Sequence, residues 1–416
     1  MDDMSMRRAI ERKRQGEELE PTEWEAIVSA YVDGTVDDAQ MAAMAMACVW
    51  RGLSTKESAA MTRAMVDSGQ RLEYPTDVVV VDKHSSGGVG DVISMIAVPV
   101  VAAAGGHVAK LSGRALGHTG GTIDKLETIP GFDVALSMDA FVRQVERIGC
   151  AIATQTDAFV PADKRLYRLR DRTGTVPNMG LIAASIVSKK VAGGAHAFVF
   201  DVKCGAAAFM NDPASAIELA QALVAISQEF GKRARAIVSD MNEPLGQSIG
   251  TGIEVIEARE FLRGNHNVPR VRTLCLKICE TMLDLSGIAN PLETATRALD
   301  SGAAYEKFVE LIEAQRGSRA GFEAMTVSTQ HESLLADQSG FVHSMDAVAL
   351  GNIARDLTAR DPVGGIKVGV RTGDRIEKGQ PLAEIYGPHG HAKKIKRAFT
   401  ISETPPEPRP LVYATV

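Results

Sequence analysis

Apolar residues recur at three- and four-residue spacing through the first 65 residues, a pattern that predicts amphipathic helices. The pattern is clearest in WEAIVSAYVDG, DDAQMAAMAMACVWRG and TKESAAMTRAMVDSG, each of which ends in glycine, a frequent helix stop. Helix N-caps are expected at polar positions in or before these runs, at Thr22, Asp37 and either Ser54 or Thr55. We therefore predict a helical domain over residues 1–68.

The pattern changes at Tyr74-Pro75, where a β-branched run follows. VVVV, at residues 78–81, has the composition of a fully buried strand, which we expect to end at Asp82. Strand-like segments (HVAKL, CAIATQ, AFVFDVK, RARAIVSD) then alternate with helix-like ones (MDAFVRQVERIG, ASAIELAQALVAISQEFG). This alternation is typical of an α/β domain with a mostly parallel central sheet.

A second helical stretch interrupts the alternation at residues 161–193, which contain no convincing strand pattern. We predict that it joins residues 1–68 in one small, discontinuous all-helical domain. The large α/β domain then comprises residues 69–160 and 194–335, and the short strands of residues 336–416 form a C-terminal α+β portion. A cleft between the helical and α/β domains is the natural place for a ligand.

Composition and charge narrow the class of protein. The chain has 416 residues, enough for two or three domains, and a net charge of −6, which argues against non-specific binding to nucleic acid or anionic membranes. No apolar run follows the N-terminal charges, and the most apolar stretch, residues 92–106, is too short to span a bilayer. The five cysteines are scattered, and packing explains Cys275 and Cys279 better than half a metal site. We expect a cytoplasmic protein.

The segment VVVVDKHSSGGVGDVISMIAVPVVAAAGG has the design of a phosphate cradle. A strand leads into a loop with three glycines, and an apolar helix begins near Asp91. Glycines let backbone N–H groups converge on an anion, and a helix N-terminus adds its dipole. Lys83 adds a full charge, while Ser85 and Ser94 offer hydroxyls. The loop lacks the GxxxxGK[ST] and GxGxxG spacings, so a glycine-rich turn with surface charges is the alternative.

A second strand–loop–helix segment, AKLSGRALGHTGGTIDKLETIPGF, has the same character. Its strand ends at Ser112, and its glycine-rich loop leads to Thr122 and a helix. Two such units can point at one anion from two sides.

The third segment, RLYRLRDRTGTVPNMGLIAASIVSKK, places Arg170, Ser185 and Lys189 in the helical insert. Ser185 and Lys189 are four residues apart and therefore share one helix face. Together with a histidine from the other domain, these groups suit a ring with two carbonyl oxygens and an N–H between them, as in uracil. A solvated basic helix face is the alternative.

Together the three segments resemble the thymidine and pyrimidine-nucleoside phosphorylase family. DKHSSGGVGD, SGRALGHTGGTIDKLE and YRLRDRTGTV…SIVSKK match its motifs in order and spacing, and the likeness runs from about residue 5 to the C-terminal RPLVYATV. The resemblance implies reversible phosphorolysis of pyrimidine nucleosides in nucleotide salvage, with a nucleoside and inorganic phosphate as substrates and no required cofactor. It also implies hinge closure over the substrates and a homodimer formed through the helical domain.

The resemblance also assigns roles position by position. It implies that phosphate is bound by Lys83, Ser85, Ser94, Ser112 and Thr122, and the pyrimidine by His84, Arg170, Ser185 and Lys189. The implied catalytic residues are His84, Arg170 and Lys189. Some family members bind a potassium ion, and the matching positions here are Gly90, Val92, Leu245, Ser248 and Glu257.

Lys110 occupies the position near the ribose 2′ carbon where broad-specificity members of the family have lysine and thymidine-restricted members an apolar residue. An ammonium can donate to a 2′-hydroxyl, and water can replace that hydroxyl in a 2′-deoxy sugar. We therefore expect uridine, thymidine and deoxyuridine all to be cleaved. The alternative is that Lys110 faces solvent or only the phosphate.

Several positions depart from the family pattern. Ser86 replaces the usual threonine, VPNMGLI and KCGAAAFM are unusual near the base pocket, and the region near GGIKVGV is shorter. His107, His118 and His196 are expected to be structural, with His118 a candidate aid to closure. Two rival classes stay open: a phosphoribosyltransferase of the same fold, which leaves the third segment unexplained, and a non-catalytic nucleoside-binding homologue, against which the intact site positions argue.

Overall fold

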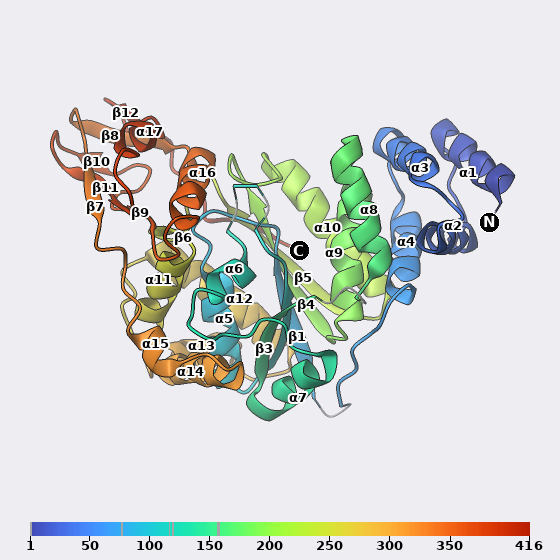
Figure 1. The fold of residues 1–416 in the computed structure, drawn as a ribbon, viewed down its shortest axis with the longest axis horizontal. Helices are drawn as coiled ribbons and strands as arrows, with labels where there is room; N and C mark the ends of the chain where they lie inside the picture. The colour runs from blue at the N-terminus through green and yellow to red at the C-terminus, as the bar shows by residue number, and fades with distance from the viewer. Residues whose placement is uncertain (1, 76–77, 116, 119, 156–158) are drawn as a thin grey trace.

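A six-stranded sheet lies at the centre of the computed structural model, which describes residues 2–75, 78–115, 117–118, 120–155 and 159–416 (Figure 1). The strand order is β13-β5-β4-β1-β2-β3. Five strands are parallel: β1 (Val80–Ser85), β2 (His107–Ser112), β3 (Cys150–Thr154), β4 (Ala197–Cys204) and β5 (Arg233–Asp240). The predicted mostly parallel sheet is confirmed.

The first strand differs from the prediction at its end. We expected it to end at Asp82, but β1 continues to Ser85, so that Lys83 and His84 lie on the strand and not in the loop. The reason is pairing with β4, which extends from Val81↔Ala197 to Ser85↔Asp201. Backbone pairing to a fully buried neighbour overrides the weak strand propensity of these polar residues.

Helices cover both faces of the sheet, as is usual for parallel sheets. One face carries a core to which the apolar helix α5 contributes its buried residues. Around it lie α6 (Thr122–Leu126), α11 (Gly252–Leu262), α12 (Pro269–Leu285), α13 (Pro291–Asp300), α14 (Ala303–Ala314) and α15 (Arg319–Glu323), with α5 itself spanning Ile93–Ala103. Cys275 and Cys279 are buried in this core on α12. A second core on the opposite face includes α10 (Pro213–Glu229) and much of α7 (Met138–Ile148).

Two stretches far apart in sequence make the helical domain at one end of the molecule (Figure 1). The helices are α1 (Asp3–Gln15), α2 (Pro21–Asp33), α3 (Asp38–Arg51), α4 (Thr55–Asp67), α8 (Pro161–Thr173) and α9 (Met179–Ala192). Contacts join α2 and α3 to α8 and α4 to α9. The predicted discontinuous all-helical domain is confirmed, and its boundaries at 68, 160 and 193 stay predictions.

The caps of these helices follow the prediction in two cases of three. Asp37 and Ser54 cap α3 and α4 through reciprocal capping boxes. Thr22 does not cap α2, because the helix already begins at Pro21 and Glu20 is its N-cap. Proline favours the first helical position, since its missing N–H would have no helical partner there.

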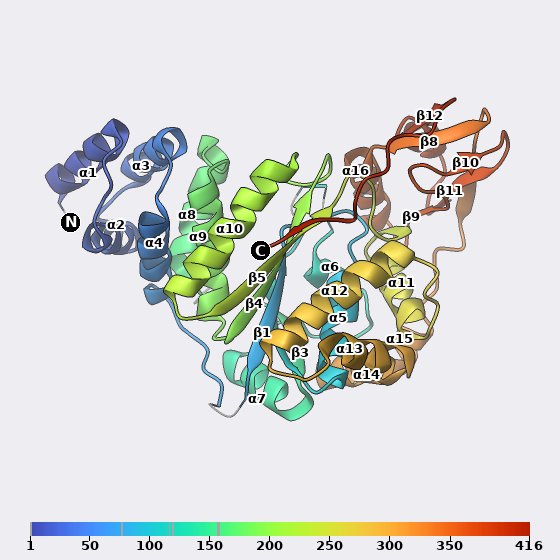
Figure 2. The same cartoon turned by 180° about the vertical axis from the view of Figure 1, so that it is seen from behind.

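The C-terminal α+β portion lies at the opposite end of the molecule from the helical domain. It contains β7 (His331–Leu335), β8 (Gly340–Met345), α16 (Ala347–Thr358), β9 (Gly365–Val368), β10 (Arg375–Ile376), β11 (Pro381–Tyr386), α17 (Ala392–Lys396) and β12 (Phe399–Ser402). The short strand β6 (Ser248–Gly250) joins its four-stranded sheet from the α/β segment. β13 (Val412–Thr415) leaves it and pairs antiparallel with β5 (Figure 2). None of the helices in the described ranges is long and apolar enough to cross a membrane.

Candidate active site

A cavity of about 710 Å³ lies between the carboxyl ends of the sheet strands and the helices α8 and α9. This is the usual position of a ligand in open α/β folds. The loops after β1 and β2 supply one wall, which we call the sheet wall, and α8 and α9 supply the helical wall. Nine of the ten predicted substrate residues line the cavity: His84, Ser85, Ser94, Lys110, Ser112, Thr122, Arg170, Ser185 and Lys189. Lys83 does not.

Ser85 and Ser94 bring two hydroxyls to the sheet wall at the N-terminus of α5. Ser85 Oγ donates to Asp91 Oδ2 at 2.9 Å, and Asp91 Oδ1 accepts from the backbone N–H of Ile93 at 3.1 Å. Gly90 has a φ of +63°, a left-handed turn that glycine adopts without strain. The hydroxyls and the positive end of the helix dipole make this wall suitable for an anion.

Lys83 lies behind the sheet wall and is fully buried. Successive strand residues face opposite sides of a sheet, so β1 points Lys83 toward the core beneath α5 and His84 toward the cavity. Lys83 Nζ lies 3.5 Å from Ser94 Oγ, a cavity residue, and 3.3 Å from Asp201 Oδ2. The lysine is therefore placed to act through or beside Ser94.

The second glycine-rich loop is tied to the first through α6. Ser112 is the last residue of β2, as predicted. Thr122, to which we expected the loop to lead, is itself the first residue of α6. Lys125 of α6 donates to the Asp91 carbonyl oxygen at 2.9 Å and pairs with buried Glu254 at 2.6 Å. The two loops are therefore held against each other. Leu116 and Thr119 of this motif lie outside the described residues.

The same loop also contacts distant parts of the chain. His118 Nε2 lies 3.1 Å from the carbonyl oxygen of Ala207, in the segment that follows β4. Arg355 Nη1 on α16 donates to the Gly117 carbonyl oxygen at 2.9 Å. The C-terminal portion thus contributes to the position of a loop that borders the cavity.

The positively charged side chains of the helical wall already have partners within the helical domain. Lys189 Nζ pairs with Asp163 and donates to Ser185 Oγ at 2.8 Å, as expected for residues on one helix face. All three guanidinium nitrogens of Arg170 donate to backbone carbonyl oxygens, of Thr175, Leu181 and Val176, at 3.2, 3.0 and 2.6 Å. Arg170 therefore also fixes the turn between α8 and α9.

His84 and Lys110 complete the cavity near the junction of the two walls. Burial, followed by the positive charges of Lys190 and Lys110, holds the pKa of His84 well below its usual range, so the imidazole is neutral. Burial and the neighbouring Lys190 lower the pKa of Lys110 to about 7. Lys190 is itself paired with Asp82 at 2.6 Å. Within the described ranges Lys110 Nζ makes no hydrogen bond or ion pair, although its side chain is buried.

Sequence reasoning missed two groups of cavity residues. Asp163, the partner of Lys189, gives no signal because a carboxylate in the first turn of a helix is ordinary. The other group is an apolar surface formed by Tyr167, Val176, Ile182, Phe209, Met210 and Leu219. Phe209, half exposed at 51%, and Met210 lie in the unusual KCGAAAFM segment. Val176 and Ile182 lie in VPNMGLI, so these two segments were the signal that pointed to the surface.

Comparison with known proteins first places the chain in a glycosyl transferase class. The chain matches the family models described as "Glycosyl transferase family, helical bundle domain" over residues 7–69 and "Glycosyl transferase family, a/b domain" over residues 77–305. Its fold resembles that of an anthranilate phosphoribosyltransferase from Thermus thermophilus, with a TM-score of 0.60 and 21% identity. That likeness covers 74% of this chain and 99% of the other, and it shows the fold alone.

The remaining matches narrow the class to one family. Residues 341–402 match the model "Pyrimidine nucleoside phosphorylase C-terminal domain". The chain is 42% identical to a thymidine phosphorylase of Mycobacterium tuberculosis, over 97% of this chain and 96% of that one. It is 39% identical to a pyrimidine-nucleoside phosphorylase of Geobacillus stearothermophilus over 99% of both chains, and 40% identical to one of Bacillus subtilis over 92% of both. The chain belongs to the thymidine and pyrimidine-nucleoside phosphorylase family.

Proposed function

We propose that this chain is a pyrimidine-nucleoside phosphorylase that splits uridine, thymidine and deoxyuridine reversibly with inorganic phosphate. The products are the free base and the α-1-phosphate of ribose or deoxyribose. The observation that carries this proposal is the cavity itself, which sets hydroxyls and a helix N-terminus on one wall opposite Arg170, Ser185 and Lys189 on the other. Membership of the family supports the same reaction.

Phosphate would bind at the sheet wall. Ser94, Ser112 and Thr122 line the cavity with hydroxyl donors, Ser85 can exchange its bond to Asp91 for one to phosphate, and Lys83 supplies positive charge from behind Ser94. Held there, a phosphate oxygen attacks C1′ of the sugar as the glycosidic C–N bond breaks. Direct attack inverts the configuration at C1′, and positioning supplies much of the rate gain.

The base would bind at the helical wall. The bonding pair of the glycosidic bond leaves with the base, so negative charge develops on the ring and its oxygens. Lys189 and Arg170 stabilise that charge electrostatically, and Ser185 orients the ring. Neutral His84 donates an N–H hydrogen bond to a base oxygen and so stabilises the developing charge. It is the candidate proton donor once the imidazole has taken up a second proton, which the negative charge on the ring favours.

Lys110 would bind the sugar at its 2′ position. Its buried side chain, which has no partner among the residues that the structure describes, lines the cavity on β2 and can donate to a ribose 2′-hydroxyl. A pocket with one such donor favours ribose without excluding deoxyribose, because water can replace the hydroxyl. This supports activity on both series of nucleosides.

A structural potassium ion is part of the proposal. Oxygen atoms converge around two glycines: a Cβ on Gly246 would lie 2.5 Å from Glu257 Oε1 and 3.0 Å from the Gly90 carbonyl oxygen, and one on Gly90 would lie 3.0 Å from the Ser248 carbonyl oxygen. Several oxygens including one carboxylate suit a hard cation, although Glu257 also accepts from the N–H groups of Gln247 and Ser248. Leu245 and Val92 would supply the remaining oxygens of the proposed site. Arg371 shares the Leu245 oxygen at 3.3 Å. The ion would link the phosphate loop to the segment after β5.

A homodimer through the helical domain, in the cytoplasm, is also proposed. Met4 on α1 and Met46 and Trp50 on α3 are exposed, with Trp50 at 79%. Met46 and Trp50 are four residues apart and share a helix face, and α1 packs against α3. An exposed apolar surface of this kind fits a second copy of the chain. Trp50→Glu should shift the sedimentation coefficient to that of a monomer, and an unchanged value would place the interface elsewhere.

The reaction is tested by incubating the purified protein with uridine and phosphate, and separately with thymidine and phosphate. Free uracil and thymine should appear together with an α-1-phosphate, identified by ³¹P NMR. Anthranilate with phosphoribosyl pyrophosphate is the parallel incubation for the rival transferase. Release of no base from either nucleoside would refute the proposal.

A further inference from the structure

Four charged side chains lie together behind the phosphate side of the cavity, and we call them the charge quartet: Lys83, Asp91, Asp201 and Lys203. Their side chains are at most 8% exposed. Lys83 comes from β1, Asp91 from the loop before α5, and Asp201 and Lys203 from β4. Only Asp91 of the four reaches the cavity. Neither Asp201 nor Lys203 has a part in the function proposed above.

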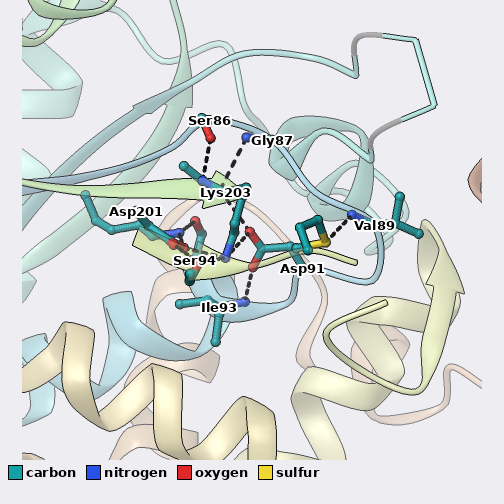
Figure 3. A network of polar contacts seen from close by, with 12 residues as sticks. Ser86, Gly87, Val89, Asp91, Ile93, Ser94, Asp201 and Lys203 are labelled. Carbon is teal, nitrogen blue, oxygen red and sulfur yellow. Dashed lines mark hydrogen bonds and ion pairs between the residues drawn. The ribbon is translucent and has the colours of Figure 1, made fainter. Parts of the chain in front are cut away.

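The distances within the quartet are unequal. Lys203 Nζ lies between the two carboxylates, 2.7 Å from Asp201 Oδ2 and 3.5 Å from Asp91 Oδ2 (Figure 3). Lys83 Nζ is farther from Asp201 Oδ2, at 3.3 Å. Ser239 Oγ also donates to the other oxygen of Asp201, Oδ1, at 2.6 Å. Asp201 is therefore held mainly by Lys203 and Ser239.

The pKa shifts within the quartet agree with the role of Lys203 as the main counter-ion. Burial alone would lower the pKa of Lys203, but the Asp201 and Asp91 carboxylates outweigh it and raise the pKa. Burial alone would raise the pKa of Asp91, but Lys203 and then Lys83 hold it below its usual range. Lys203 and Asp91 therefore stay ionised although they are buried. Without Lys203, two carboxylates would face the single ammonium of Lys83 a short distance from Ser94 and Ser85.

We propose that Lys203 is a positioning residue for phosphate: it serves as counter-ion to Asp201 and Asp91, which leaves the charge of Lys83 available to an anion at Ser94. The proposal rests on the proposed function, because it takes Ser85 and Ser94 to be the phosphate site. It predicts that phosphate affinity follows the charge balance of the quartet. A role in packing alone predicts no such dependence.

The test compares Lys203→Met, Asp201→Asn and the double variant by calorimetric titration with inorganic phosphate and by the KM values for phosphate and uridine. Lys203→Met should weaken phosphate binding by about tenfold or more, the effect of one uncompensated charge at short range, with little change in the KM for uridine. The double variant, which loses one charge of each sign, should recover most of the affinity. Asp201→Asn alone should bind phosphate as tightly as the unaltered protein or more tightly.

Lys13→Met is the matched control, because Lys13 forms an equally buried pair with Glu57 at 2.7 Å in the helical domain, outside the cavity lining. It should lower the Tm and leave phosphate affinity unchanged. Unaltered protein that bound no phosphate would refute the proposed function itself. If the unaltered protein binds phosphate, equal binding by Lys203→Met, or no recovery in a folded double variant, overturns the role of Lys203. Should Lys203→Met not fold, loss of phosphate affinity in Asp201→Asn would overturn it.

Discussion

The two walls of the cavity differ in how many of their polar groups already make hydrogen bonds or ion pairs within the protein. On the helical wall, Lys189 is paired with Asp163 and Ser185, and every nitrogen of Arg170 faces a backbone carbonyl. On the sheet wall, Ser85 Oγ donates to Asp91, but Ser94 Oγ is approached by Lys83 only at 3.5 Å. Lys110 Nζ, at the β2 side of the junction, has no partner in the described ranges. A ligand on the helical wall must therefore exchange existing contacts, whereas one on the sheet wall mostly adds new ones.

The difference follows from what supports each wall. The sheet wall stands on β1 and β2, which are buried along most of their length, so its geometry is set before a ligand arrives. The helical wall stands on two helices, of which α8 is entered through Val160, a β-branched residue with a φ of +51°. Such a conformation is strained in valine. We therefore expect phosphate binding to need little rearrangement and base binding to need local adjustment of α8 and α9.

The largest effect is expected at the sheet wall. Lys83→Ala should raise the KM for phosphate by about 100-fold or more, because an anion loses a buried charged partner that contributes several kcal/mol. The KM for uridine should change far less. Steady-state kinetics with phosphate varied at saturating uridine measures this, and activity within about threefold of the unaltered enzyme would remove Lys83 from the site.

Arg170→Ala is expected to have the next largest effect. It removes both leaving-group stabilisation and the three bonds to the turn between α8 and α9, so kcat/KM should fall about 100-fold for every pyrimidine substrate. Arg170→Lys keeps the charge but not the three bonds, and separates the two contributions. A change confined to the KM for phosphate would reverse the assignment of the two walls.

Asp163→Asn tests whether the internal partners of the helical wall matter. Asparagine keeps the shape but removes the charge that holds Lys189, so we expect kcat/KM for nucleosides to fall about tenfold. Phosphate affinity, measured separately by titration, should not change. Equal losses for both substrates would show that Asp163 supports the fold as a whole.

The smallest effect concerns the sugar. Lys110→Met should lower kcat/KM for uridine by about tenfold, which is the effect of losing one charged hydrogen bond. The value for thymidine should not change. In the unaltered enzyme the pKa of Lys110 is about 7, so its ammonium is present below that pH and lost above it. The ratio of kcat/KM for uridine to that for thymidine should therefore decline as the pH rises through this range. A ratio independent of pH, or equal losses on both nucleosides, would assign Lys110 to the phosphate or the fold.

Much of the site was predictable because its determinants are local. The second glycine-rich loop predicted that β2 ends at Ser112 and that a helix follows the loop that leads to Thr122, and helical spacing placed Ser185 beside Lys189. The predictions of a cap at Thr22 and of a strand end at Asp82 were wrong, because other residues decide these two positions. Helix α2 begins at Pro21, one residue before Thr22, so the threonine cannot cap it. Pairing with β4 extends β1 to Ser85.

The sequence by itself determined the elements, the discontinuous helical domain and the residue types that meet in the cavity, because periodicity, glycine and charge act over a few residues. Only the tertiary structure decided that Lys83 stands behind Ser94 while His84 faces the cavity, since alternation along a strand does not say which face the ligand will occupy. It also decided that Asp201 and Lys203 join Lys83, that Asp163 holds Lys189 and that β13 returns to β5. The pairs Asp163–Lys189 and Lys83–Asp201 and the pairing of β13 with β5 join residues from 26 to more than 100 positions apart, and such partners are chosen by packing and by the burial of charge.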